Sequence, residues 1–315
     1  MLNYIVKRLL ALIPVLLGLS LIVFLIMALI PGDPALAILG SYATPESLKS
    51  LRVELGLDRS LPMQYLIWIN NIAHGDFGRS YSLNRPVLDE VIERFRATLI
   101  LSTTAFVLCT IWGVLGGVAS AVNQFGRIDR IITILVLIGI SIPSFWLGLL
   151  LILIFAVDLH WLPVSGMYEI YGGGDLFDLA RHLILPATTL SVVATGVIAR
   201  LTRASMLEVL RQDYVRTARA KGASERSVIF HHALKVALVS ITPTLGVQAG
   251  FVLGGAVYVE TVFQWPGIGQ MLVNAISTRD VLLVQGGVLI VATSYVLFNL
   301  IADVVQHLVD PRVRS

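Results

Sequence analysis

The stretch Leu9–Ile30, LLALIPVLLGLSLIVFLIMALI, is an uninterrupted apolar run of 22 residues. A helix needs about 20 apolar residues to cross a bilayer, whereas the apolar part of a secretory signal has only about 7–15. Lys7 and Arg8 precede the run as they would in a signal peptide, but no cleavage site of small residues follows it, and the run closes on PGDP at 31–34. The stretch therefore predicts a retained first transmembrane helix.

The rest of the chain has the same apolar character. Hydrophobic residues make up 56% of the 315 residues and charged residues 14%, and the mean hydropathy is +0.83. Soluble domains contain about 25% charged residues, so a bilayer is the expected solvent. Six blocks are long enough to cross it, and six spans place both termini on one side. These blocks are Leu9–Ile30, Ala97–Val122, Ile131–Val157, Leu183–Ala199, Ala237–Val259 and Leu282–Val305.

The basic residues are distributed unevenly between the loops. With both termini inside, 14 of the 23 Lys and Arg residues lie in or beside cytoplasmic segments, and the short outer loops 158–182 and 260–281 hold one each. The other seven lie in 31–96, a segment too long to weigh in the positive-inside rule. We therefore expect both termini in the cytoplasm. The net charge of +3 reflects this orientation, and we expect no nucleic-acid partner.

Segment 31–96 lies outside in this topology and has helical patterns of its own. Thr44 is placed to cap a helix that begins at the following proline and stops at Gly56. The stretch 62–74 has apolar residues at helical spacing, and Trp68 is a candidate anchor at the membrane interface. These helices form a platform for an external partner on one interpretation, and a cap over the outer helix ends on the other.

The connection between the fourth and fifth spans, residues 204–236, is longer than two antiparallel helices need. Gly222 interrupts its helical pattern and can turn the chain with a positive φ. Ser224 is placed to cap a second helix that leads into the fifth span. Before the glycine, a stripe at helical spacing predicts one continuous helix with arginines around it. The stripe consists of Leu207, Leu210, Tyr214, Ala218 and Lys221.

At this connection the chain resembles a known family. The stretch 214–222, YVRTARAKG, followed by His-Ala-Leu at 232–234, is similar to the cytoplasmic signature of ABC importer permeases, in particular their dipeptide, oligopeptide and nickel branch. The resemblance extends over most of the chain. Its further motifs are PGDP at 31–34, GGAV at 254–257, VETVF at 259–263, WPG at 265–267 and DPR at 310–312.

The resemblance implies an all-α integral membrane protein with six transmembrane helices, the type I ABC importer permease architecture and a folded periplasmic segment after the first helix. It implies the permease subunit of an ATP-driven importer in the bacterial inner membrane, forming half of the pathway for peptides or a related small solute. The alternative is a stand-alone secondary transporter or channel. The expected divisions are a first helix (1–30), a periplasmic segment (31–96), a transmembrane core (97–305) and a cytoplasmic tail (306–315).

The partners that the resemblance implies are a second homologous permease, two cytoplasmic ATPase subunits, a periplasmic solute-binding protein and membrane lipid. The connection would dock on the ATPase and transmit its motion, because small residues permit close approach and arginines can pair with carboxylates. The alternative for the residues alone is a basic helix lying on anionic headgroups. The residues expected to carry the coupling are Tyr214, Arg216, Thr217, Ala218, Arg219, Lys221 and Gly222.

Glycines recur at four-residue spacing in two spans, which lets neighbouring helices approach closely. Sliding contacts and static packing explain them equally well. They are Gly113 and Gly117 in the second span and Gly246, Gly250 and Gly254 in the fifth. Gln248 and Glu260 are candidates for the solute pathway, since a polar side chain in a span is costly unless it faces protein or water.

The sequence contains no recognisable motif for catalysis. It lacks the phosphate-binding loop that ends in Gly-Lys-Ser/Thr, the His-Glu-x-x-His and Gly-x-Ser-x-Gly motifs, and clustered His and Cys ligands. The single cysteine, Cys109, lies in an apolar block and has no disulfide partner. We therefore expect a non-catalytic subunit with no metal site and no bound cofactor, and with ATP and Mg²⁺ used by partner ATPases.

Overall fold

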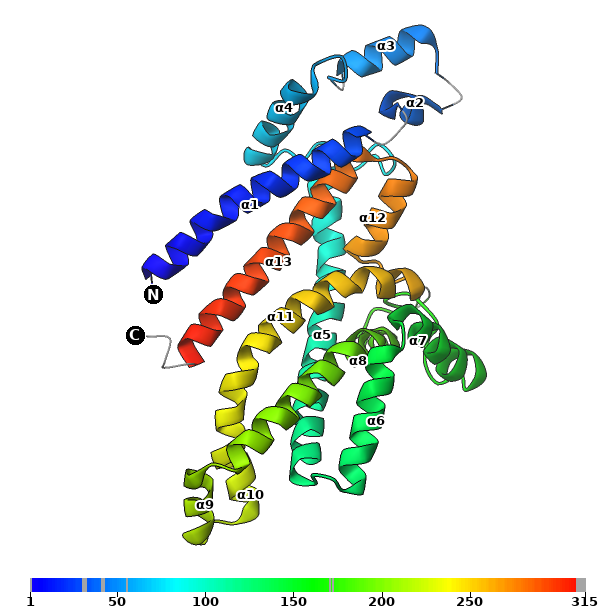
Figure 1. Ribbon diagram of the computed structural model, residues 1–315. Coiled ribbons are helices and arrows are strands. Elements are labelled where there is room, and N and C mark those ends of the chain that lie inside the picture. Colours follow the sequence, from blue (N-terminus) through cyan, green and yellow to red (C-terminus); the bar gives the residue numbers. More distant parts are fainter. Residues whose placement is uncertain are drawn as a thin grey trace. The chain divides into compact units, whose positions relative to one another are not determined.

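In the computed structural model the chain is helical, and the structure describes residues 2–29, 33–40, 43–54, 56–169, 171 and 173–309. The helices form two compact units, which are treated separately (Figure 1). Unit 1 comprises Met1–Ala97 and Pro266–Val296, and unit 2 comprises Thr98–Trp265 and Leu297–Ser315. This is a division by packing, and the division by membrane side stays a prediction. Outside the described residues lie Pro31 and Gly32, Gly172 and the motif at 310–312.

Long apolar helices run through both units (Figure 1). In the part of the chain that the structure describes, five helices are long and apolar enough to cross a membrane, and a bent helix pair raises the number to six if it counts as one span. The all-α class is confirmed, with five or six helical spans of transmembrane length. The five are α1 (Leu2–Leu29), α5 (Val87–Val122), α8 (Leu176–Leu210), α11 (Leu234–Val262) with the short helices before it, and α13 (Val281–Val309).

Helix α8 is much longer than the apolar block that predicted it. The block ended at Ala199, whereas the helix continues to Leu210. Its 35 residues make it about 52 Å long, against about 30 Å for the hydrocarbon core of a bilayer. Polar side chains do not stop a helix once it has left the lipid, so hydropathy marks where the lipid ends and not where the helix ends. The excess length carries the following residues away from the membrane.

The third predicted span, 131–157, is broken near its middle, which corrects the expectation of one uninterrupted helix. Helix α6 (Arg127–Ser141) ends before Pro143, and the chain then leaves at an angle of 107°. A proline restricts the preceding residue to extended backbone, and Ile142 accordingly has φ −80° and ψ 127°. The second limb consists of α7 (Ser144–Leu151) and the π-helical turn η2 (Ile152–Asp158).

Unit 1 contains α1, four short helices and the adjoining parts of α5 and α13. The capping signals act as predicted: Thr44 Oγ1 accepts the N–H of Ser47 at 3.1 Å, and Gly56 turns the chain after the helix with a φ of +66°. The short helices are α2 (Pro34–Leu39), α3 (Pro45–Glu54), α4 (Leu61–Ala73) and α12 (Ile268–Ser277).

Trp68 packs inside unit 1. Its ring stacks on Phe24 of α1 with centroids 6.2 Å apart, and Tyr65 meets Phe24 edge-on at 5.4 Å. The hydroxyl of Tyr65 lies 2.9 Å from Ser20 Oγ on the same helix. Trp68 is only 8% exposed, so the expectation of an anchor at the membrane interface is wrong. The apolar face of α4 is used to hold α1 instead.

A buried carboxylate fastens the loop before α5 to the start of α13. Asp280 accepts hydrogen bonds from Ser80 Oγ at 2.6 Å and from the N–H and Oγ of Ser82 at 3.0 and 2.9 Å. Its other oxygen accepts the N–H of Leu283 at 3.2 Å. A buried charge is costly unless hydrogen bonds satisfy it, so these donors fix the loop. The apolar core of unit 1 is the cluster of Val87, Val91, Ile268, Met271, Ala275, Leu283 and Val284.

Glycines bring the helix backbones of unit 2 close together. A Cβ atom on Gly113 would lie 2.7 Å from Ile198, and one on Gly117 would lie 2.6 Å from the carbonyl oxygen of Ala199, so α5 touches α8 at both glycines. Gly196 of α8 meets Ile140 of α6 in the same way. Lipid tails are as apolar as these helices, so close packing between small residues is what holds them together.

We expect Gly117→Ala to destabilise the fold, because its Cβ would press on backbone that cannot move aside. Overpacking of this kind costs about 1–3 kcal/mol, which lowers the midpoint of thermal unfolding in detergent by several degrees. Gly116→Ala is the matched control, since the nearest atom to a Cβ there is 3.9 Å away. Equal midpoints for the two variants would contradict the close contact of α5 with α8.

Candidate functional site

The residues that join α8 to α11 form the most distinctive surface of unit 2, and we refer to residues 211–233 as the connecting segment. It contains α9 (Asp213–Ala220), the single turn α10 (Glu225–Ser227) and the π-helical turn η3 (Val228–Ala233). In Figure 1, α9 and α10 lie at the same end of unit 2 as the turn from α5 into α6. Among the described residues of this unit, no other part extends as far beyond the long helices at that end.

The predicted stripe does not lie on one helix, which corrects the expectation of a continuous helix up to Gly222. Helix α8 ends at Leu210, and Gln212 has extended backbone, with φ −74° and ψ 150°. The stripe is therefore divided between two helices. The prediction missed this because the periodicity of the apolar residues does not show a break of two residues. Leu207 and Leu210 belong to α8, Tyr214 and Ala218 belong to α9, and Lys221 is the C-cap of α9.

The turn after α9 is a glycine-dependent cap. Gly222 has a φ of +84°, and its N–H donates to the carbonyl of Arg219 at 2.9 Å. The N–H of Ala223 donates to the carbonyl of Ala218 at 3.2 Å. This pair of bonds is the Schellman motif, which satisfies carbonyls at a helix end and requires a left-handed residue. The predicted positive φ of Gly222 is confirmed.

Two further interactions fix the chain after the turn. Ser224 caps α10 as predicted, with its side chain accepting the N–H of Ser227 at 3.4 Å. Arg219 of α9 binds the carboxylate of Glu225 with both ends of its guanidinium, at 2.8 and 3.2 Å. A bidentate pair holds both position and angle, so α9 and α10 keep a defined geometry although both are near solvent.

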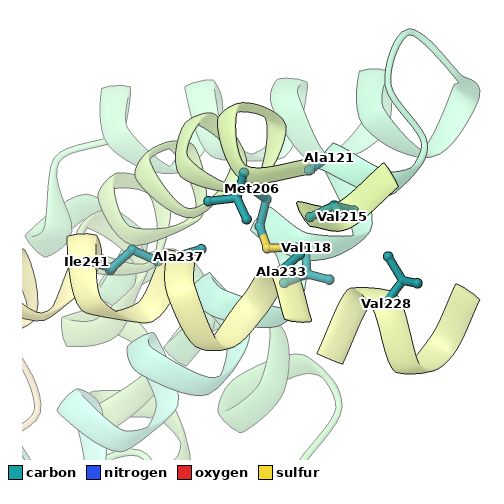
Figure 2. Packing of buried hydrophobic residues seen from close by; sticks show 9 residues of the cluster. Val118, Ala121, Met206, Val215, Val228, Ala233, Ala237 and Ile241 are labelled. Atoms are coloured by element: carbon teal, nitrogen blue, oxygen red, sulfur yellow. The ribbon is translucent and has the colours of Figure 1, made fainter. Parts of the chain in front are cut away.

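One side of the connecting segment is buried in an apolar cluster shared with three long helices. Val215 of α9 and Val228 of η3 are fully buried. In Figure 2, the side chains of Val118, Met206, Val215 and Ala233 converge from α5, α8, α9 and η3. The segment is therefore attached to the body of unit 2 by close packing. The cluster comprises Val118, Ala121, Met206, Val209, Val215, Val228, Ala233, Ala237 and Ile241.

Val215 was absent from the residues predicted from sequence to matter here. It is the one large aliphatic residue between Leu210 and Val228, and that isolation was the available signal. Tyr214, which the sequence suggested as an anchor, instead remains 40% exposed, and its hydroxyl donates to the carbonyl of His232 at 3.4 Å. Ala218 is half-buried against the cluster.

The other side of α9 faces solvent and is basic. The side chain of Arg216 is 72% exposed, with Asp213 3.5 Å away, and Thr217 and Lys221 are also exposed. The hydrogen bond from Arg219 to Glu225 raises the pKa of the guanidinium, outweighing the opposing effect of burial, and burial raises the pKa of the Tyr214 hydroxyl. At neutral pH Arg219 therefore stays charged and Tyr214 stays neutral. Residues 211–226 hold five basic and two acidic side chains.

The candidate residues within the long helices lie apart from this segment. On α11, Gly246 and Gly250 are buried, whereas Gly254 is exposed and a Cβ there would meet no atom within 4 Å. Gln248 is half-buried. Glu260 is fully buried and accepts a hydrogen bond from Thr98 Oγ1 at 2.5 Å, so its carboxylate is not open to a solute in this structure.

The chain is similar to known proteins over its whole length. Residues 113–315 match the family described as the binding-protein-dependent transport system inner membrane component, and residues 1–102 match the N-terminal region of such membrane components. The dipeptide transport system permease protein of Alkalihalophilus pseudofirmus is 41% identical over 332 residues, and the glutathione transport system permease protein of Escherichia coli strain K12 is 42% identical over 314 residues. Each alignment covers 100% of this chain and at least 99% of the relative.

The fold is also shared with a solved structure. A chain of the inward-facing MetNI methionine ABC transporter superposes with a TM-score of 0.58 at 18% identity, covering 70% of this chain and 96% of that chain. This similarity concerns the fold alone. It extends to the type I arrangement of the transmembrane helices that the sequence had suggested.

We expect Val215→Asp to detach α9 while the long helices stay folded, because a buried carboxylate without a partner is costly. Hydrogen exchange of the amides in 213–227 should then rise by at least tenfold, since α9 is held by the buried cluster. Thr217→Asp introduces the same charge on the exposed side of the helix and should leave exchange unchanged. Equal protection in both variants would show that Val215 does not anchor α9.

Proposed function

Because this chain belongs to the family of binding-protein-dependent transport system inner membrane components, it is a permease subunit of an ABC importer, and we propose that its connecting segment receives the motion of a separate ATPase. The chain is a multi-pass inner-membrane protein and is not itself an enzyme, since ATP hydrolysis in such importers lies in other subunits. An ATPase and a solute-binding protein are therefore among its partners.

The observation that supports this role is the two-sided character of α9. Val215 attaches the helix to a cluster that includes residues of α5, α8 and α11, so a displacement of α9 displaces all three. On the opposite side Arg216 extends into solvent, where an acidic groove on a partner would bind it. A helix that only lay on lipid headgroups would not need a firm attachment to three transmembrane helices.

We infer the composition of the whole complex from the family. The chain pairs with a second, similar permease around a central pathway, two ATPase subunits bind at the cytoplasmic side and use ATP with Mg²⁺, and the binding protein delivers cargo at the other side. The exposed face of α11 supports a second permease, because it is apolar and includes a glycine, which suits close contact with another helix in lipid. It is formed by Val247, Phe251, Gly254 and Tyr258.

The cargo we propose is a short peptide or a peptide-like solute such as glutathione, after the transport systems of the two relatives. A binding protein that closes around its cargo selects it before the permease is reached, so this chain needs only a pathway of suitable width. The binding protein that works with this permease should therefore identify the cargo. Native mass spectrometry of that protein, purified from cells, would report the mass of what it holds.

We expect ATP-dependent uptake only from the complete assembly. The permease purified under gentle conditions should bring down an ATPase in stoichiometric amount, and proteoliposomes that contain the permease pair, the ATPases and the binding protein should accumulate cargo when ATP is supplied. Omission of any component should abolish uptake. Uptake by this chain alone, driven by an ion gradient, would overturn the proposal in favour of a secondary transporter.

We expect the connecting segment and both termini on the cytoplasmic side, as the distribution of basic residues indicates. In a Cys109→Ala background, Thr217→Cys should react with a membrane-impermeant maleimide in inside-out vesicles and not in right-side-out ones. Tyr171→Cys is the matched control, because Tyr171 is 91% exposed in the loop before α8 and should react with the opposite preference. The reverse pattern at both sites would invert the topology.

A further inference from the structure

A buried carboxylate outside the connecting segment has no part in the proposed function so far. Asp129 lies in the first turn of α6, and its side chain is only 7% exposed. Its Oδ1 accepts from Ser120 Oγ and from Arg203 Nε, the latter at 2.8 Å, and its Oδ2 accepts from the N–H of Phe125 and from Arg203 Nη2, each at 2.9 Å. Both oxygens are thus occupied by two donors each, which removes most of the cost of burying the charge.

This ion pair joins parts of the chain that are distant in sequence. Asp129 and Ser120 belong to α6 and α5, on either side of the turn between those helices, and Arg203 belongs to α8, 74 residues further on. The contact is bidentate, so it fixes the angle of α8 against the α5–α6 turn as well as their separation. A lysine in place of Arg203 would supply charge without this fork.

The ion pair lies next to the cluster that anchors the connecting segment. Val118 and Ala121 lie within two residues of Ser120 in α5, and Met206 lies about one helical turn after Arg203 in α8. All three apolar residues belong to the buried cluster with Val215. Nearby, α5 and α8 also touch at Gly117, where a Cβ would lie 2.6 Å from the carbonyl oxygen of Ala199. The α5–α6 turn, α8 and α9 are therefore connected by packing and by charge within a short distance.

We propose that the Asp129–Arg203 ion pair is a rigid joint that makes the α5–α6 turn move together with α8 and α9 when the ATPase displaces the connecting segment. Asp129 and Arg203 are positioning residues in this role, since neither touches cargo or nucleotide. The joint rests on the proposed function of the connecting segment. Without it, the push on α9 would still reach α5 and α8 through the buried cluster, but the α5–α6 turn and α6 would be free to change their angle to α8.

The test is a distance measurement in the assembled transporter. Spin labels at Asn123→Cys, beside the α5–α6 turn, and Gln212→Cys, before α9, are introduced into a Cys109→Ala background, because both sites are exposed and the native cysteine is buried. A rigid joint predicts the same single distance in the nucleotide-free complex and in the complex trapped with ATP and vanadate. If the distance between the labels differs between the two states while the native ion pair is present, the proposal of a rigid joint is wrong.

Substitutions of the ion pair supply the second readout. Asp129→Asn keeps the shape of the side chain and removes its charge, and it should split the distribution of label distances in the trapped state. Asp129→Glu keeps the carboxylate and should give a single distance. Uptake of a mixture of labelled glycyl-leucine and glutathione per ATP hydrolysed should fall about tenfold in Asp129→Asn, a size typical of coupling between sites. ATP hydrolysis itself should change by less than about twofold.

Controls separate the possible failures. Asp280→Asn neutralises a carboxylate that is equally buried in unit 1 and should leave uptake per ATP unchanged. If Asp129→Asn does not reach the membrane, Arg203→Lys replaces it, because lysine keeps the positive charge but cannot bind both carboxylate oxygens as arginine does. This variant should broaden the distribution of label distances in the trapped state. A fully coupled Asp129→Asn complex would overturn the joint alone, whereas an unmodified complex without ATP-dependent uptake would contradict the proposed function itself.

Discussion

The contact of α5 with α8 at Gly113 and Gly117 is the interaction on which the rest of unit 2 depends. In lipid, two apolar helices gain little free energy by burying apolar surface against each other, so attraction between them has to come from close approach of their backbones. The glycines allow that approach, and α6 repeats it on α8 through Gly196. Once these backbones touch, the side chains at one end of the helices are brought to a common point. The buried cluster around Val215 is assembled there.

The cluster exists because α8 is longer than the membrane is thick. At about 52 Å it exceeds the hydrocarbon core by roughly 20 Å. Met206 and Val209 follow the predicted span, which ends at Ala199, so water is the expected alternative to their burial in protein. Val215 and Val228 then cover these residues. The connecting segment is thus held by the ordinary hydrophobic effect, while the helices that carry it are held by packing in lipid.

Features that act within a few residues were predictable from the sequence. The apolar blocks located the long helices, and the positive φ of Gly222 and the caps of Thr44 and Ser224 followed from the chemistry of single positions. The break at Pro143 was missed because a run of apolar residues hides a proline that bends the chain. The division of the stripe at Gln212 was missed because periodicity continued across a break of two residues.

Contacts between distant residues were beyond the sequence for a different reason. Ser80 and Asp280 are 200 residues apart, and no local pattern relates them. Arg203, just before the basic connection, and Arg216, within it, look alike in sequence, yet Arg203 is bound to a buried carboxylate and Arg216 is exposed. A charge that is paired inside the fold transmits position, because its partner moves with it. A charge that is exposed offers a partner a group to bind. The connecting segment and the helix before it contain both kinds of charge, and only the three-dimensional arrangement distinguishes them.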